Sequence, residues 1–301
     1  GGIGGVSANQ SQAVDPVSGE PVDVGIAARR TQNARIDATS AAASVAAGLG
    51  QTAVGIAGAG ASATNVILTD TNALIEDSDI RRANIIDVDA TDSSSIDALI
   101  ISVSAAFGIG QVGVGAAVGV SMARNLIGYQ QVDHPTETTL KTGDSYQDVI
   151  NKKGEGLIES GDTVLVDGGI NAGEVYEYIS PNPLRIEPMQ HVGDKDLRNT
   201  DLWRQVNLDP TPSNVTAKVV DSSILADGDL SVTATSSPTI ESSVQAGAVA
   251  IGAGQAGVGV SGTGVSTQNK INTHVEASVN GDGTGITVGA VDIDAIDTSR
   301  I

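Results

Sequence analysis

Residues 111–125 read QVGVGAAVGVSMARN, and the same Gln, Gly-rich apolar run and closing Asn recur at 51–65 and 255–269. Residue numbers rise by 60 from the first copy to the second, and by 144 to the third, which is one more period and an extra segment of 84. A second marker is the isoleucine that closes each unit, found at Ile36, Ile96, Ile240 and Ile301. Self-similarity at a fixed period indicates a stacked architecture in which each unit buries its apolar face against its neighbours.

The composition suits thin layers better than a globular core. Of the 301 residues, 40% are apolar but only 2% are aromatic, with one Trp and one Phe. A globular enzyme normally fills its interior with Leu and Phe, whereas a core of Ala and Val fits layers that stack closely. The composition therefore favours a solenoid over a globule.

The charge of the chain argues against a nucleic-acid partner, and its lack of cysteine excludes disulfides. The net charge of −20 lacks the basic footprint that nucleic-acid binding needs, and it keeps a long fibre soluble. Cysteine is absent, so a secreted form would have no disulfides, which large stacked β structures do not need. The Gly-rich start, Gly1 to Gly5, reads like the middle of a repeat, and we expect the chain to be an excerpt from a longer array.

Strands with period-2 alternation precede the closing isoleucines. Their apolar residues fall in register in three units: Ile86-Val88-Ala90, Leu230-Val232-Ala234 and Val291-Ile293-Ala295. The residues between them are Asp, Ser or Thr, so one face of each strand is buried and the other is wet. A second strand lies upstream in each unit and is followed by a turn at Asp77-Ser78, Asp221-Ser222 or Gly281-Asp282.

The sequence of the Gly-rich stretches is compatible with more than one secondary structure. Gly113 and Gly115 alternate with valines, which leaves one face without side chains and lets another backbone approach. The run from Ala98 to Ala123 is uncharged and long enough for a membrane span, and its small residues also suit close-packed helices. The Gly content, the interior Gln and the period-2 pattern favour strands. One repeat unit would hold two or three coils of about 20–30 residues each.

The extra segment, residues 129–214, differs in composition from the repeats. It holds all four Tyr, the only Trp and six of the nine Pro. Strands are predicted at 161–166, 175–179 and 202–206. The predicted fold is all-β: a parallel β-helix or solenoid of about 60-residue units over 1–128, an inserted small β-rich module over 129–214, and the solenoid continued over 215–301.

The repeat pattern resembles that of very large bacterial surface proteins, the filamentous-haemagglutinin-like adhesins. The likeness covers 20–128 and 215–301, and it lies in the recurrence of the Ala-Gly-Val stretch, the Asn and the closing strand. The insert is distantly similar to small carbohydrate-binding modules with a Gly-Asp-x-Val, Tyr and Trp pattern. The resemblance implies secretion, a parallel β-helix and a role at the cell surface or in an extracellular filament.

The motifs of catalysis are missing from the sequence. It has no Gly-x-Ser-x-Gly elbow, its Gly-x-Gly motifs lack the Lys-Ser/Thr of a phosphate loop, and its three histidines share no spacing. We therefore predict no enzyme and no catalytic residues, and we rank a β-helical polysaccharide-degrading enzyme third. Paired carboxylates could bind Ca²⁺ or form solvated strand faces. The second interpretation is favoured, so no metal site is predicted. The pairs are Asp77 and Asp79, Asp87 and Asp89, Asp227 and Asp229, and Asp292 and Asp294.

The aromatic residues of the insert are the candidate ligand-binding residues. Tyr176 and Tyr178 share a face because they are two apart on a strand, and with Trp203 they could form a sugar-stacking platform. The alternative use is core packing, since each ring buries about 150–250 Å². Core packing is favoured in a small domain with few other large side chains.

The leading functional hypothesis is a structural segment of a giant secreted surface protein, a shaft or filament that associates with itself. The alternative is an adhesin in which the insert, residues 129–214, recognises a polysaccharide or another surface ligand. Neither hypothesis requires a cofactor, a nucleic acid or a membrane span.

Overall fold

The computed structural model describes residues 24–132, 138–168 and 172–301, so positions 1–23 of the predicted 1–128 segment lie outside it. Strands make up 72% of the structure and helices 4%, and most of the pairing is parallel. The prediction of an all-β fold is confirmed.

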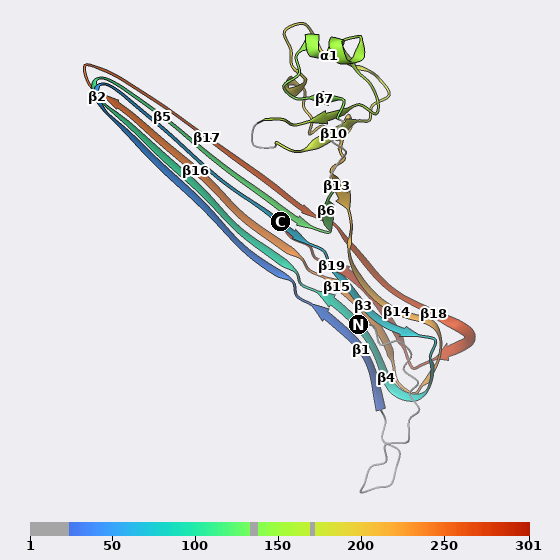
Figure 1. Cartoon of the computed structure of the whole chain (residues 1–301). Helices are drawn as coiled ribbons and strands as arrows, with labels where there is room; N and C mark the ends of the chain where they lie inside the picture. The colour runs from blue at the N-terminus through green and yellow to red at the C-terminus, as the bar shows by residue number, and fades with distance from the viewer. Residues whose placement is uncertain (1–23, 133–137, 169–171) are drawn as a thin grey trace.

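One repeat is a flat loop with a turn at each end (Figure 1). β2 (Arg35–Ile67) runs to the far tip and folds back there. The two legs of the strand come so close at the tip that only glycine fits at Gly48, since a Cβ there would lie 2.3 Å from the carbonyl oxygen of Val54. Gly50 has a φ of 151° at this tip. The chain then continues through β3 (Asp70–Glu76), turns at the opposite end and returns along β4 (Asp79–Asp92).

The strands form two large sheets, which we call the arm and the base. The arm, which reaches to the tip, contains β2, β5 (Ser95–Ile127), β16 (Thr239–Ala253) and β17 (Ala256–Ile271). The base contains β1 (Val24–Gln32), β3, β4, β14 (Ser213–Ala226), β15 (Leu230–Ser236), β18 (Thr273–Thr287) and β19 (Val291–Asp297).

Pairing in the arm follows the sequence repeat. β2 pairs with β5 in parallel from Arg35 opposite Ser95 to Ile67 opposite Ile127, with a constant offset of 60 in residue number. On its other edge β5 pairs with β16 and then β17, so that Asn125 lies opposite Asn269, an offset of 144. Each repeat thus meets the next repeat once per period, and the prediction of two or three coils per unit is wrong.

In the base, too, strands pair in parallel with the equivalent strands of the next repeat. β14 lies between β3 and β18, and β15 lies between β4 and β19, with Val232 beside Val88 and Ile293. Val88 and Val232 lie in the large apolar core of the base, as their alternating strands predict. Ile293 is 45% exposed, so the buried face predicted for its strand is wrong: β19 pairs with β15 along one edge, and the described residues do not cover it further. Asp77 and Asp221 each adopt a φ of 47° where the loops turn, a left-handed conformation that Asp tolerates better than most residues.

Each repeat of the arm runs out to the tip and back, so the arm has an outgoing and a returning layer. Small side chains fill the space between these two layers. Ala57, Ala106 and Ala117 form one inner cluster, and the Ser121 hydroxyl donates to the Ser102 hydroxyl at 2.9 Å. The glycines between them let the two backbones approach closely. The helical alternative for this run is replaced by strands, and among the described residues no helix has the length and apolarity to cross a membrane.

The repeated asparagines form a hydrogen-bonded ladder across three repeats. Asn65 Nδ2 donates to Asn125 Oδ1 at 2.7 Å, and Asn125 Nδ2 donates to Asn269 Oδ1 at 2.8 Å. Asn125 is fully buried in the middle of the ladder. The ladder explains why Asn recurs at this position, because each amide satisfies its neighbours when identical positions stack in register.

Asn125→Ala is expected to lower the free energy of unfolding by about 1–2 kcal/mol. The substitution removes two hydrogen bonds and leaves an amide donor on Asn65 and an acceptor on Asn269 without their partner. The cost stays moderate because these two residues sit in the outer repeats, closer to water. Urea unfolding measures this loss, and a variant with Ala at all three positions is the control. A triple variant that is no less stable than the single variant supports the ladder, because it leaves no amide unpaired. A single variant as stable as the unmodified chain contradicts the ladder.

The insert leaves the arm after β5 on a two-stranded stalk. Its strands are β6 (Tyr129–Gln131), β7 (Leu140–Lys141), β8 (Leu157–Ile158), β9 (Thr163–Leu165), β10 (Val175–Tyr178), β11 (Leu184–Arg185), β12 (Trp203–Gln205) and β13 (Leu208–Pro210). β6 and β13 make the stalk, and β7, β9, β10 and β12 make a small sheet. Pairing of the base resumes at Ser213, slightly before the expected Val215.

A helix in the insert was missed by the sequence analysis. α1 (Tyr146–Lys153) begins with a capping box, in which Ser145 and Asp148 bond each other's backbone amides. It ends at Gly154, which has a φ of 83°. Ser145, Asp148 and the Lys-Lys-Gly ending are standard helix boundary signals, and they could have identified this element.

Candidate functional site

The three predicted aromatic residues lie in the core of the insert. Tyr176, Tyr178 and Trp203 are only 8%, 2% and 2% exposed and belong to one apolar cluster. The Tyr178 and Trp203 rings meet edge to face with centroids 4.9 Å apart, and the Tyr178 hydroxyl donates to the carbonyl of Asn182 at 2.6 Å. The structure places the three together in packing, and their role in ligand binding stays a prediction.

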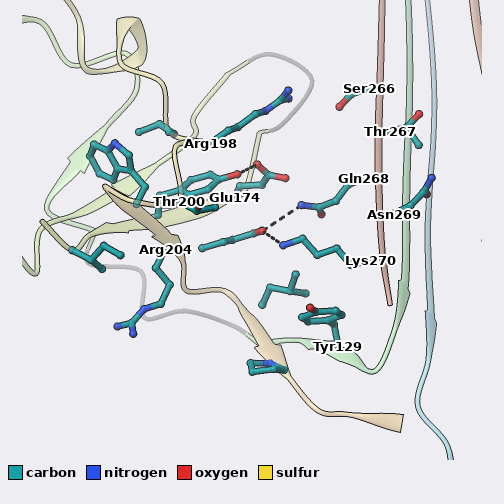
Figure 2. A pocket seen from close by; sticks show the side chains of 17 residues that line it. Tyr129, Glu174, Arg198, Thr200, Arg204, Ser266, Thr267, Gln268, Asn269 and Lys270 are labelled. Carbon is teal, nitrogen blue, oxygen red and sulfur yellow. Dashed lines mark hydrogen bonds between the residues drawn. The ribbon is translucent and has the colours of Figure 1, made fainter. Parts of the chain in front are cut away.

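A groove of about 760 Å³ lies between the insert and the returning strand of the arm (Figure 2). Tyr176 and Trp203 form part of its wall. From β17, Gln268 and Lys270 point across the groove toward the insert, whereas Asn269 points to the opposite side of the strand. The groove therefore joins parts of the chain that are far apart in the sequence.

A buried ion pair fastens the insert to the arm beside this groove. Arg124 on β5 donates through Nη2 to Glu174 Oε1 at 2.9 Å, and the two side chains are 11% and 4% exposed. The Tyr176 hydroxyl donates to the other carboxylate oxygen of Glu174 at 2.7 Å. Burial, followed by the bond to this carboxylate, raises the pKa of Tyr176 well above its usual range. The phenol therefore stays protonated and serves as a hydrogen-bond donor.

Lys270 is the half-buried cation of the groove. Its Nζ donates to Gln205 Oε1 at 3.3 Å and lies 5.6 Å from the centre of the Tyr129 ring. Gln268 donates to the same oxygen of Gln205, also at 3.3 Å. Burial lowers the pKa of Lys270, the charge of Glu174 opposes that shift, and Arg124 adds to it. Lys270 has no ion-pair partner among the residues that the structure describes.

Three buried polar atoms at this junction lack a hydrogen-bond partner in the described part of the chain. They are Nε of Arg124, Nε1 of Trp203 and Oε1 of Gln268. Buried polar groups in proteins are nearly always bonded to protein, water or a ligand. The junction therefore contains polar atoms whose burial is not compensated by a bond within the described residues.

The paired carboxylates lie along strand faces and turns. Arg81 bonds Asp79 and holds the pKa of that carboxyl below its usual range, and Arg29 pairs with Asp87. Within the described ranges, no three His, Asp or Glu side chains gather as metal ligands do. The prediction about calcium itself stays open to experiment.

The groove residues gave little signal in the sequence. Tyr129 lies at the start of the insert and Lys270 in the repeat that follows it, and no motif links them. The one available cue was the composition of the insert, which marks it as a separate unit. Comparisons with family models, curated proteins and solved structures found no match to this chain, so the resemblance to filamentous-haemagglutinin-like repeats stays a prediction.

Proposed function

We propose that this chain is a non-catalytic structural segment of a large extracellular repeat protein, a β-solenoid shaft at the bacterial cell surface. In this proposal each repeat is one flat coil, and the coils stack along the axis of the shaft. The observation that carries it is the continuous parallel pairing of β5 with β2 on one edge and with β16 and β17 on the other, always between equivalent positions.

The end repeats support growth of the stack. In the described part of the chain, β2 pairs along one edge only, and so do β16 and β17. Their outer edges carry free backbone donors and acceptors, which a further repeat of the same kind would cover. Among the described residues, Asn269 accepts a bond from Asn125 through Oδ1, and its own Nδ2 donor is free to extend the ladder in the same direction.

The outer faces of the arm support lateral association. Large apolar side chains stand outward along both layers, among them Leu49, Ile56, Val103, Ile109, Val118, Val258 and Val260, all more than 45% exposed. Exposed apolar side chains in this number usually mark an interaction site. We propose that arms of neighbouring copies pack side by side.

Electron microscopy of the purified protein, with and without a calcium chelator, tests this function. We expect filaments or bundles that chelation leaves unchanged. Ile109→Glu places a charge on the outer face and should abolish the bundles while the unfolding temperature stays within a few degrees. Met189→Glu adds the same charge on the insert, at a side chain that is 98% exposed, and should leave the bundles intact.

Two results would contradict the proposal. Monodisperse single molecules at high protein concentration would show that the apolar faces do not associate. Isolated rods that lose order on chelation would make the paired aspartates metal ligands and remove the filament.

The groove favours a second function, recognition of a ligand by the insert. A concave site lined by apolar, polar and basic side chains is a typical binding site, and it stands beside the shaft rather than inside it. In this second proposal the shaft displays the insert, and the ligand lies against both.

A further inference from the structure

The groove carries a local positive charge in a strongly acidic chain. Its wall contains three basic residues, Arg198, Arg204 and Lys270, against one acidic residue, Glu174. The whole chain has 36 acidic and 16 basic residues. A concentration of cations within a concave, partly dry site attracts anions even when the net charge of the protein is negative.

Only some of these cations are already neutralised. Arg204 bonds Glu177 at 2.5 Å, and Glu174 is satisfied by Arg124 and Tyr176. Arg198 and Lys270 have no acidic partner among the described residues. In Figure 2 the Arg198 side chain extends from the insert toward β17, and Lys270 extends from that strand toward the insert at another level of the groove. Two unpaired cations thus border one volume.

The uncharged lining matches a ligand rich in hydroxyl groups. Thr267 on β17 contributes a hydroxyl to the wall. Thr200 and the amide of Gln205 add further polar groups, and Leu197 and Pro210 provide apolar wall for ligand C–H groups. The volume lies within the roughly 300–1,000 Å³ that small-ligand sites occupy.

We propose that this groove binds a carboxylate-bearing saccharide, an oligomer of a uronic acid, with Arg198 and Lys270 on its carboxylates and Thr200 and Gln205 on its hydroxyls. The inference rests on the second function proposed above and is independent of the shaft. It keeps Tyr176 and Trp203 as wall residues, leaves Tyr178 to the core of the insert, and makes the arm part of the sugar site. Binding of a carboxylate also offsets the burial that lowers the pKa of Lys270.

Titration calorimetry of the full chain with tri-galacturonate tests the proposal, with neutral galactotriose as the matched ligand. We expect tri-galacturonate to bind at least tenfold more tightly, and we expect its affinity to fall as salt is raised. Arg198→Gln and Lys270→Met should each weaken binding at least fivefold. Arg198 is exposed and unpaired in the described structure, so its variant keeps the fold. Arg185→Gln, which alters an exposed arginine outside the groove wall, should bind like the unmodified chain.

Several results would overturn the inference. These are equal affinity for the two sugars, no heat with tri-galacturonate, unchanged affinity in both groove variants, or tighter binding of a tri-glutamate peptide. If binding fails while filaments still form, the groove inference is wrong and the shaft stands. If binding occurs in a protein that forms no filaments, the shaft is wrong and the groove stands.

Discussion

Gly113→Ala is expected to lower the free energy of unfolding by about 2–3 kcal/mol, although it adds a single methyl group. Gly113 lies on the inner face of the returning layer in the central repeat. A Cβ there would stand 2.2 Å from the carbonyl oxygen of Gly108 and 2.6 Å from that of Ala253. Both atoms are backbone, so neither can rotate away, and the two layers of the arm must separate locally. Urea unfolding followed by circular dichroism measures the loss.

Gly58→Ala is the matched control for this prediction. Gly58 lies in the same Gly-rich run one repeat earlier, and a Cβ at this position meets nothing within 4 Å. Alanine loses less conformational freedom than glycine on folding, so we expect this variant to be unchanged or up to about 1 kcal/mol more stable. Equal stability of the two variants would mean that the layers are not in close contact, and the arm would have to be described differently.

The pairing of strands between repeats was predictable from the recurring asparagine. Identical residues one period apart stack when each copy pairs in parallel with the next, as Asn65, Asn125 and Asn269 do. The alternating strand at Ile86-Val88-Ala90 was predictable for the same reason, since its apolar face is buried in the base. Periodicity and register are local properties of a sequence, and they transfer directly to the fold.

The path of the chain within a repeat was not predictable in the same way. A repeat of about 60 residues fits several short coils as well as one long flat loop. What decides between them is the contact between outgoing and returning strands at the tip, where Gly48 meets Val54, Gly108 meets Val114 and Gly252 meets Val258. The period marks these positions in the sequence, but it does not tell that the two members of each pair face each other. The groove is further from prediction still, because it exists only where the insert lies against β17.

Glu174→Gln is expected to weaken the attachment of the insert to the arm by about 3–5 kcal/mol. The substitution removes the negative charge that faces Arg124 and leaves the guanidinium 11% exposed with no acidic partner. A buried charge without its partner keeps its full desolvation cost, and the Nε of Arg124 is already unbonded in the described structure. Hydrogen exchange at the stalk strands β6 and β13 should rise sharply, while exchange in the base stays slow.

Two comparisons separate the ion pair from a general loss of fold. Arg204→Gln breaks an ion pair of the same insert whose arginine is 65% exposed, and it should cost less than about 1 kcal/mol. Arg124→Gln combined with Glu174→Gln removes both charges and should recover much of the loss, because no charge is then left buried. A double variant as damaged as the single one would show that packing, not charge, fastens the insert. Recovery in the double variant would instead mean that the direction of the insert relative to the arm depends on one buried pair, and that the shape of the groove depends on the same pair.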